Sequence, residues 1–381
     1  MGANVSSFSD IIIRYGRIAF TPRARTQSVP KLDLNGFMIL PGLINAHDHL
    51  EFNLFPRLGR GPYPNAAAWA EDIFKPSQEP IASQLKLPKP VRLWWGGLKN
   101  LLSGVTSVAH HNPFEPSVFG RCFPVRVLRR FGWAHSLNFC PDITACFRRT
   151  PSGAPFIIHA AEGTDSSSRQ ELYRLDEARL LRPSTVLVHG VAIQPEDLNL
   201  LRTRGASLVW CPTSNLFMLG RTLSPELLRS EIPIALGTDS ALTGEGDLLD
   251  ELPVAASHVG ASRLYRMVTT EAARILHLTA GEGKIQDGGV ADLVVIRANG
   301  DAPPSSLLGS RPELVFLKGR LMLISDHAAR ELRLKDLDDY QMVEIEGRGK
   351  WLVQADLRAF MDTTREILGE PVCLAGRRVI T

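Results

Sequence analysis

The sequence predicts an α/β protein, a (β/α)8 barrel of the TIM type that carries a small β-sandwich domain built from both ends of the chain. Three observations support this fold class. The length of 381 residues and the hydrophobic content of 44% allow a large buried core. In the middle of the chain, short apolar runs alternate with helical stretches, a pattern typical of parallel βα units. Strand-like segments also occur near both ends.

The strand-like ends suggest how the chain divides. Short strands are expected within residues 10–40, and similar signals return at 291–296 and 313–322. We therefore predict a small β-sandwich domain formed by residues 1–38 and 285–381, with the barrel, residues 39–284, inserted between them. Near the C-terminus, residues 352–368 are expected to form an amphipathic helix that packs on the outside of the protein.

Within the barrel region the sequence contains eight strand candidates. They are residues 38–47, 105–110, 125–128, 133–139, 156–160, 185–189, 207–211 and 233–238. Only residues 129–132 separate the third candidate from the fourth, whereas a crossover between parallel strands needs about a dozen residues. Either the barrel is abbreviated here or one bent strand has been divided in two. Residues 52–90, rich in proline and glycine, directly follow the first strand and are a candidate lid or substrate wall.

The composition argues against a nucleic-acid-binding or membrane protein. Lys plus Arg is 43 and Asp plus Glu is 40, a net charge of +3 without long blocks of like charge, so we expect no nucleic-acid or membrane surface. The five cysteines are scattered and form no Cys-x-x-Cys motif, which favours a reducing, cytoplasmic setting. No signal peptide or apolar run of transmembrane length is evident. The expected partner is a small-molecule substrate, and a homodimer is left open.

The first predicted strand ends in two histidines. His47 and His49 are two positions apart and would lie on one face of the strand with Cα atoms roughly 6.5–7 Å apart. Two imidazoles at this spacing can converge on one metal ion at the strand end. Asp48, between them, would point away and is expected to be structural.

Three later strands also lead into an ionisable residue, namely His159, His189 and Asp239. In a parallel barrel all strand C-termini open on the same face, where such proteins keep their active sites. A repeated pattern of this kind is hard to explain by packing. Imidazoles with one carboxylate suit Zn²⁺, and Fe²⁺ takes the same donors. The predicted ligands of one divalent ion, with water in the open position, are His47, His49, His159 and Asp239.

Catalysis by a metal-activated water also needs a group that moves protons. Glu162, three residues after His159, is the predicted general acid/base, which takes the proton of the water and delivers it to the leaving nitrogen. His189 is expected to polarise the substrate and orient the water, although a fifth metal-ligand role is the alternative. Asp239 is counted among the catalytic residues as well as the ligands.

Several residues near the strand ends are candidates for substrate contacts. They are Glu51, Trp94, His110, His111 and His135. His110 and His111 are adjacent, so at most one of them is expected to face the pocket. Trp94 could stack on a planar ring or pack between helices. Ser214 and Asn215 are expected to cap the helix after the seventh strand.

These motifs resemble those of a known family. The segment Pro41-Gly42-Leu43-Ile44-Asn45-Ala46-His47-Asp48-His49 is similar to the opening motif of the amidohydrolase superfamily. Its later motifs are matched in order by His159-Ala160-Ala161-Glu162, His189-Gly190, Cys211-Pro212-Thr213-Ser214-Asn215-Leu216 and Gly237-Thr238-Asp239-Ser240. The match is best to the cytosine/guanine deaminase and chlorohydrolase branch, over about residues 36–300.

The resemblance implies a single metal held by the first-strand histidine pair, the fifth-strand histidine and the eighth-strand aspartate. It also implies proton transfer by the glutamate, assistance by the sixth-strand histidine, and the terminal β-sandwich. No lysine occurs in residues 112–150, where two-metal members carry a bridging lysine, and this favours one metal ion.

Three functions are considered. The leading hypothesis is hydrolytic deamination, or ring opening, of a nitrogen heterocycle. The second is hydrolysis of an exocyclic amide or N-acyl bond at the same metal site, for which Arg126, Arg129 and Arg130 could supply a cationic pocket. The third is a non-catalytic binding protein on an enzyme scaffold. The nature of the released product separates the first two, and the absence of bound metal would favour the third.

Overall fold

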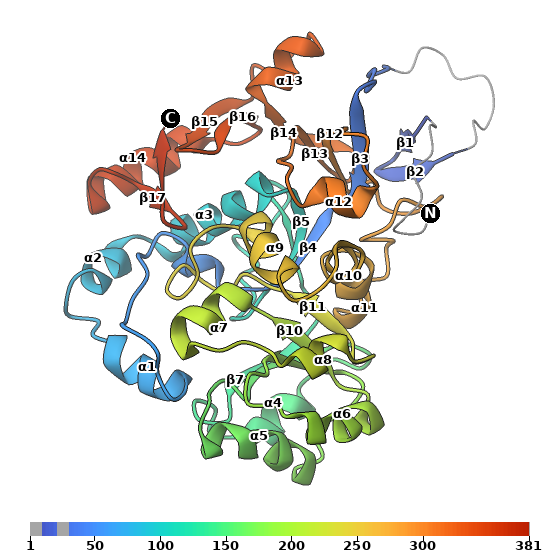
Figure 1. Ribbon diagram of the computed structural model, residues 1–381. Helices are drawn as coiled ribbons and strands as arrows, with labels where there is room; N and C mark the ends of the chain where they lie inside the picture. Colours follow the sequence, from blue (N-terminus) through green and yellow to red (C-terminus); the bar gives the residue numbers. More distant parts are fainter. Residues whose placement is uncertain (1–9, 21–29, 381) are drawn as a thin grey trace.

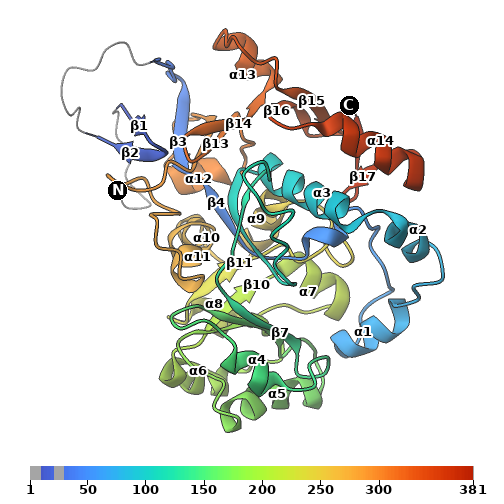
Figure 2. The same ribbon diagram turned by 180° about the vertical axis from the view of Figure 1, so that it is seen from behind.

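A computed structural model describes residues 10–20 and 30–380 of the protein. Residues 1–9 and 21–29, which belong to the predicted small domain, lie outside this described part, as does residue 381. The view in Figure 1 and the opposite view in Figure 2 show the barrel strands in the middle, helices around them, and the C-terminal sheet with its helices along one side. No helix among the described residues is long and apolar enough to cross a membrane.

Eight parallel strands form the centre, and each of the eight predicted strands is present. They are β4 (Leu43–Asp48), β5 (Val105–His110), β6 (Arg126–Val127), β7 (Gly132–Ser136), β8 (Phe156–Ala160), β9 (Thr185–His189), β10 (Ser207–Trp210) and β11 (Ile234–Leu236). Nearly all their residues are buried. Burial on both faces is typical of parallel sheets covered by helices, and it explains the continuous apolar runs.

Helices and two 3₁₀ turns connect most of these strands or follow the last one, although none of the described residues between β5 and β6 or between β6 and β7 is helical. They are η1 (Leu50–Phe52), α1 (Ala66–Ile73), α2 (Ile81–Lys86), α3 (Lys89–Leu102), α4 (Ile143–Arg148), α5 (Ser166–Glu177), η2 (Pro195–Asp197), α6 (Leu198–Arg204), α7 (Pro212–Leu219), α8 (Pro225–Arg229), α9 (Leu248–Ala256), α10 (Ala261–Met267) and α11 (Thr270–Ile275). Residues 52–90, the predicted lid or wall, thus contain two helices, α1 and α2.

The parallel strands form two ladders instead of one closed barrel. One ladder has the order β4-β5-β6 and the other has the order β11-β10-β9-β8-β7. Among the described residues no ladder joins β6 to β7, the two strands with the very short connection. The fold is therefore TIM-barrel-like, and the abbreviated stretch coincides with the break.

On the other side of the fold the two ladders meet at the strand ends that carry the histidines. The N–H groups of Thr238 and Asp239, just after β11, donate hydrogen bonds to the carbonyl oxygen of His47 at 3.0 and 3.1 Å. Gly237 permits this approach, because a Cβ atom at this position would lie 2.8 Å from the Cβ of His47. The segments that carry His47 and Asp239 are thereby placed side by side.

The remaining elements form the β-rich part of the chain. They are β1 (Ile12–Arg14), β2 (Arg17–Ala19), β3 (Phe37–Pro41), β12 (Leu293–Arg297), α12 (Pro303–Leu307), β13 (Leu314–Leu317), β14 (Arg320–Ser325), α13 (Asp326–Glu331), β15 (Gln341–Ile345), β16 (Gly349–Val353), α14 (Leu357–Leu368), β17 (Cys373–Leu374) and β18 (Arg377–Ile380). One eight-stranded antiparallel sheet has the order β17-β18-β15-β16-β14-β13-β12-β3.

The β-sandwich expected in this part is not confirmed. The described residues form one long sheet together with the short β1-β2 hairpin, whose Ile18 packs against Ala291 and Leu293. Both ends of the chain do contribute, because β3 pairs with β12.

The first predicted strand is two strands that belong to different sheets. β3 pairs with β12 in the antiparallel sheet and β4 pairs with β5 in the parallel ladder. The chain passes from one to the other at Gly42, where a Cβ atom would lie 2.2 Å from the Thr106 hydroxyl oxygen. Only glycine fits there without rearrangement, so Gly42 marks the change of sheet.

The predicted C-terminal helix is shorter than expected and packs on the barrel. It begins at Leu357 as α14, because residues 352 and 353 belong to β16. Trp95 of α3 donates a hydrogen bond from Nε1 to the Thr364 hydroxyl at 2.9 Å. Trp94 stacks on Phe360 with ring centroids 4.2 Å apart. The interface between α3 and α14 therefore uses both tryptophans.

Candidate functional site

Four histidines and an aspartate gather where the parallel strands end. His47 lies in β4 and His49 directly follows it, His159 is the penultimate residue of β8, and His189 ends β9. Asp239 follows β11. All five side chains are buried, with at most 7% of their surface exposed. The parallel order of the strands explains the gathering, because their C-terminal ends all open on the same side.

The backbone at this end is strained at three non-glycine residues. Ala161, His189 and Asp239 have φ angles of 54°, 76° and 56°, in the left-handed region. Such conformations cost about 1–3 kcal/mol each and cluster at functional sites. Two of the three residues are members of the predicted site.

The four predicted metal ligands approach one another closely. The Nε2 atom of His159 lies 3.2 Å from that of His47 and 3.4 Å from that of His49. Asp239 Oδ1 lies 3.6 Å from His47 Nε2 and 3.7 Å from His49 Nε2. Donors bound to one zinc ion at 2.0–2.1 Å in a tetrahedron are about 3.3–3.4 Å apart. The measured separations are close to this value, so the residues fit a divalent metal ion.

The protonation states of the donors fit a metal as well. Burial lowers the pKa of His47 to about 4 and holds the pKa of His159 well below 6.5, so both imidazoles are neutral at pH 7. Burial alone would raise the pKa of Asp239, but a hydrogen bond with His47 and favourable electrostatic interactions with His189, His47 and His49 outweigh it and hold the pKa well below 3.8. Neutral imidazoles and an ionised carboxylate are the forms that bind metals.

A fourth imidazole belongs to the same cluster. One ligand atom each from His47, His49, His111 and His159 can be chosen so that all four lie within 4.8 Å of one another. The sequence suggested His111 as a substrate contact, and the structure places it beside the predicted metal ligands.

Glu162 and His189 form a pair at the edge of the cluster. Glu162 Oε1 lies 3.2 Å from His189 Nε2, and Asp239 Oδ2 lies 4.0 Å from the same nitrogen. Burial raises the pKa of Glu162 well above 4.5, with smaller contributions from the charges of Asp239 and Glu171. A carboxyl group whose pKa is raised in this way is better suited to both accept and release a proton than an exposed carboxylate.

The first turn of α7 supports both Asp239 and His189, a role that the sequence prediction missed. The Ser214 hydroxyl donates to Asp239 Oδ2 at 2.6 Å, and Thr243 donates to the same oxygen at 3.0 Å. Asn215 Oδ1 lies 2.8 Å from His189 Nδ1. The expectation that Ser214 and Asn215 cap a helix was wrong, since α7 has no side-chain cap hydrogen bond. Their place directly after a strand end was the signal for their role.

Asp48 lies beneath the histidine pair in a buried polar network. Lys99 Nζ is 2.9 Å from Asp48 Oδ2. Asn53 and Asn100 donate to the two carboxylate oxygens at 2.9 and 2.8 Å. The pairing satisfies a buried charge between His47 and His49, in agreement with the structural role expected from the sequence.

Two candidate substrate residues, Glu51 and His110, contact each other at the side of the cluster. His110 Nε2 lies 3.5 Å from Glu51 Oε2. Asn112 Nδ2 donates to Glu51 Oε1 at 2.7 Å and approaches His49 Nδ1 at 3.4 Å. Glu51 is thereby connected to His49 through Asn112, which the sequence analysis did not single out.

The other two candidates, His135 and Trp94, differ in position. The His135 ring lies 4.8 Å from that of His159, centroid to centroid, and it is exposed. Trp94 is instead packed between α3 and α14, where it stacks on Phe360. The structure therefore gives Trp94 a packing partner in place of a substrate contact.

A pocket of about 310 Å³ opens beside the cluster. Its lining includes Asn65, His135, Phe139, His159, Glu162 and Glu171. Asn65 caps the N-terminus of α1, and the N–H of Ala66 donates to the Glu162 carbonyl oxygen at 3.0 Å. Residues 52–90 thus provide part of the pocket wall, one of the two roles suggested by the sequence.

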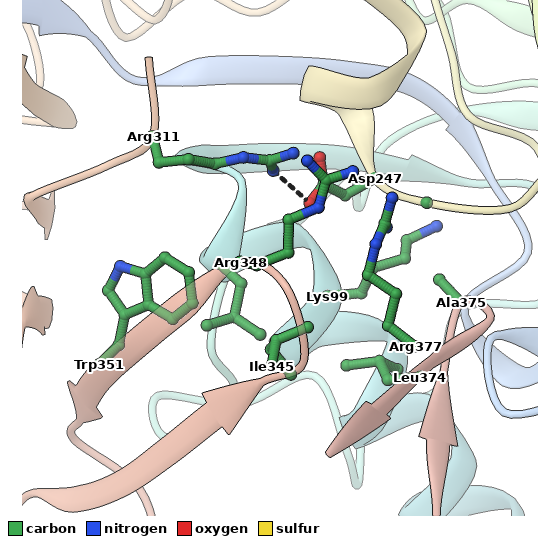
Figure 3. Close-up of a pocket in the computed structure, with 11 residues that line it drawn as sticks. Lys99, Asp247, Arg311, Ile345, Arg348, Trp351, Leu374, Ala375 and Arg377 are labelled. Carbon is green, nitrogen blue, oxygen red and sulfur yellow. Dashed lines mark hydrogen bonds and ion pairs between the residues drawn. The ribbon is translucent and has the colours of Figure 1, made fainter. Parts of the chain in front are cut away.

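A second pocket, of about 350 Å³, lies between the barrel and the C-terminal sheet. Figure 3 shows Arg311, Arg348 and Arg377 around it, with Arg311 paired to Asp247. The same three arginines pair with Asp250 of α9. This arginine cluster (Arg311, Arg348 and Arg377) links the two parts of the chain, and the lining contains none of the predicted site residues.

Comparison with known proteins agrees with the geometry. The family model described as "Amidohydrolase family" matches residues 152–322. The 5-methylthioadenosine/S-adenosylhomocysteine deaminase of Syntrophobacter fumaroxidans is 27% identical over 329 residues, 70% of this chain and 73% of that protein. The protein with the same name from Thermococcus sibiricus is 24% identical and covers 76% of this chain and 81% of its own.

Solved structures show the same fold. Atrazine chlorohydrolase TrzN from Arthrobacter aurescens TC1, complexed with zinc and atraton, matches with a TM-score of 0.71 at 18% identity, covering 94% of each chain. An adenosine deaminase from Xanthomonas campestris with bound zinc matches with a TM-score of 0.66 at 19% identity, covering 93% of this chain and 92% of its own. The motifs, the family model over residues 152–322 and the fold all resemble those of the amidohydrolase superfamily, and the similarity is to its deaminase and chlorohydrolase branch.

Proposed function

We propose that the protein is a metal-dependent hydrolase that deaminates, or opens, a nitrogen heterocycle. The observation that carries this proposal is the convergence of three imidazoles and one carboxylate at 3.2–3.7 Å, beside a carboxyl group suited to proton transfer. Relatives that are named as deaminases support the reaction type.

One divalent metal ion would be held by His47, His49, His159 and Asp239. Zinc is the preferred ion, because related structures contain it and the donors suit it. Such an ion, when bound, lowers the pKa of water from 15.7 to about 7.

Glu162 would transfer the proton. Its carboxyl lines the pocket, and its backbone is fixed by the hydrogen bond from Ala66 to the Glu162 carbonyl. Burial keeps the pKa high, so the carboxyl group can take a proton from the attacking water and return it to the leaving nitrogen. General acid/base catalysis of this kind contributes about 10²–10⁴-fold to the rate.

His189 would orient the attacking water as a hydrogen-bond acceptor, in place of the expected role of a donor that polarises the substrate. The hydrogen bond between His189 Nδ1 and Asn215 Oδ1 requires the proton on Nδ1, because an amide oxygen only accepts. In the neutral ring, Nε2 is then an acceptor and faces Glu162 at 3.2 Å. Since the pKa of His189 is lowered by burial, this tautomer is the form present at neutral pH.

The second candidate, cleavage of an exocyclic amide with help from a cationic pocket, is less well supported. Arg126, the strongest candidate for that pocket, is paired with Glu282 at 2.6 Å and Asp292 at 2.8 Å. Arg130 donates to the Ser152 carbonyl oxygen at 2.5 Å. None of the three arginines, Arg129 included, lines the 310 Å³ pocket beside the histidines. The arginines therefore offer no cationic wall for an anionic substrate there.

The direct test is ammonia release from a panel of purines, pyrimidines, pterins and triazines. The metal-loaded protein is expected to release ammonia from at least one class, and His159→Ala and Glu162→Gln are expected to abolish it. Asp176→Asn, in an exposed ion pair with Arg204, is the control. A carboxylate product would favour the amide hydrolase. A metal-loaded protein that releases no ammonia from any class would contradict the proposal.

A further inference from the structure

A fourth buried imidazole, that of His111, lies against the proposed metal ligands. It directly follows β5, and only 1% of its surface is exposed. Its ring centroid lies 4.2 Å from that of His159 and 5.0 Å from that of His47. A ligand atom of His111 lies within 4.8 Å of ligand atoms of His47, His49 and His159. Four imidazoles from three strand ends thus share one small volume.

The hydrogen bonding of His111 identifies the nitrogen that is available. Nε2 lies 3.0 Å from the carbonyl oxygen of Ala134. Because a carbonyl oxygen only accepts, Nε2 carries the proton, and Nδ1 of the neutral ring holds the lone pair. Nδ1 is buried and has no hydrogen-bond partner among the residues that the structure describes. Buried acceptors rarely lack a partner, so we expect a hydrogen-bond donor or a metal ion at Nδ1.

The neighbouring histidine is a useful contrast, because His110 is equally buried and has different partners. Its Nδ1 accepts a hydrogen bond from the N–H of Leu50 at 3.3 Å, and its Nε2 lies 3.5 Å from Glu51 Oε2. Adjacent residues of a strand point to opposite faces, and His110 is absent from the group of converging imidazoles.

We propose that His111 is an additional ligand of the metal ion and binds it through Nδ1. The ion would then be held by four imidazoles and the carboxylate of Asp239. The proposal rests on the metal site of the proposed function and adds a ligand from the second parallel strand. The hydrogen bond to Ala134 would fix the ring so that Nδ1 faces the ion, in the way that outer hydrogen bonds orient metal-bound histidines.

Two substitutions separate this role from simple packing. His111→Gln places an amide nitrogen near the position of Nε2, so it retains the hydrogen bond to Ala134 and removes the donor at Nδ1. His111→Asn places an oxygen near the position of Nδ1 and loses the bond to Ala134. If His111 only packs, His111→Gln should reduce the zinc affinity less than His111→Asn. If His111 binds the metal, His111→Asn should reduce the zinc affinity less than His111→Gln.

The measurements are zinc affinity by competition with a chelator, and the number of bound imidazoles by X-ray absorption spectroscopy of the zinc protein. We expect four imidazoles in the wild type and three in His111→Gln, with affinity reduced by about 10–100-fold or more. His111→Asn should retain more affinity than His111→Gln. His110→Gln, the matched control, should retain wild-type zinc affinity. Circular dichroism checks that each variant is folded.

Three imidazoles in the wild type, or unchanged affinity in folded His111→Gln, would overturn the inference. A protein that binds no zinc would overturn it as well. Failure of the proposed function gives a different result, namely a zinc protein with four imidazoles that releases no ammonia from any heterocycle. The reverse result, ammonia release with three imidazoles, would refute only the role of His111.

Discussion

The hydrogen bond from Ser214 to Asp239 allows a quantitative prediction. Asp239 uses Oδ1 toward His47 and His49 and uses Oδ2 to accept from Ser214 at 2.6 Å and Thr243 at 3.0 Å. Ser214→Ala removes the shorter of these two bonds and leaves the other. The carboxylate then loses part of what fixes its orientation, while every proposed metal ligand is still present.

The size of the effect follows from the charge on the acceptor. A hydrogen bond to a charged group contributes about 1.5–3 kcal/mol. Thr243 can compensate in part, so we expect a loss at the lower end, about 1.5–2 kcal/mol, which is roughly a 10- to 30-fold weaker zinc affinity. Ser214→Ala combined with Thr243→Val should weaken the affinity further, because Oδ2 then has no hydroxyl donor.

Competition between the protein and a chromophoric chelator measures this loss. The matched control is Ser306→Ala, which also removes a buried hydroxyl but one that donates to Asn299 in the C-terminal part of the chain. It should lower the thermal stability and leave the zinc affinity unchanged. If Ser214→Ala binds zinc as tightly as the wild type, the hydroxyl does not position Asp239 and this reasoning is refuted.

Three further predictions concern the support of the site and of the fold. Asn215→Leu removes the 2.8 Å contact with His189 Nδ1. We expect kcat to fall up to about tenfold, while the zinc content, measured by elemental analysis, is unchanged. An unchanged kcat would contradict the tautomer assigned to His189. Removal of the metal with a chelator should abolish ammonia release, and added zinc should restore it. At a free zinc concentration of 100 times Kd, binding should stabilise the fold by about 2.7 kcal/mol. Ammonia release that persists in metal-free protein would refute the metal requirement. Asp250→Asn removes the negative charge shared by the arginine cluster. Its unfolding free energy should fall by about 2–4 kcal/mol at pH 7, compared with less than about 1 kcal/mol for the exposed Asp176→Asn. Burial alone would raise the pKa of Asp250, but the Asp247 N–H and the arginines Arg311, Arg377 and Arg348 outweigh it and lower the pKa. The Asp250 contribution is therefore present above the ordinary value of about 3.9 and is lost as the pH falls through the lower folded-state pKa; urea unfolding of both proteins across pH 3–7 would show a constant difference if the pairing were unimportant.

The strand-end residues were predictable because the apolar run and the polar residue that follows it both indicate the C-terminal end of a buried parallel strand. An apolar run that ends in His159 or His189 indicates a buried parallel strand that presents a polar side chain at its C-terminal end. The short connection of residues 129–132 indicated either an abbreviated barrel or one bent strand divided in two; among the described residues, β6 and β7 are separate strands in separate ladders. These features depend on local sequence and on the geometry of parallel strands.

Other features could not be predicted because they depend on tertiary contacts. The single apolar run 38–47 gave no sign of a change of sheet, which became visible only from the contact of Gly42 with Thr106. Ser214 and Asn215 have the residue types of helix caps, but tertiary hydrogen bonds to Asp239 and His189 took precedence. The partner of Trp94 lies in α14, more than 260 residues later in the chain.

The adjacent histidines of the second strand show the same limit. Alternation predicted that at most one of His110 and His111 faces the site, and the sequence did not distinguish between them. The orientation of each ring depends on a partner outside β5. The carbonyl of Ala134 in β7 contacts His111, and the carboxylate of Glu51 in η1 contacts His110.

The central claim is that distant residues of the chain hold one metal ion. A crystal structure of the zinc-loaded protein, with anomalous diffraction recorded on both sides of the zinc absorption edge, tests it most directly. We predict one anomalous peak within about 2.0–2.2 Å of a side-chain donor of His47, His49, His159 and Asp239. No peak among these four residues, or a zinc ion bound elsewhere, would contradict the account.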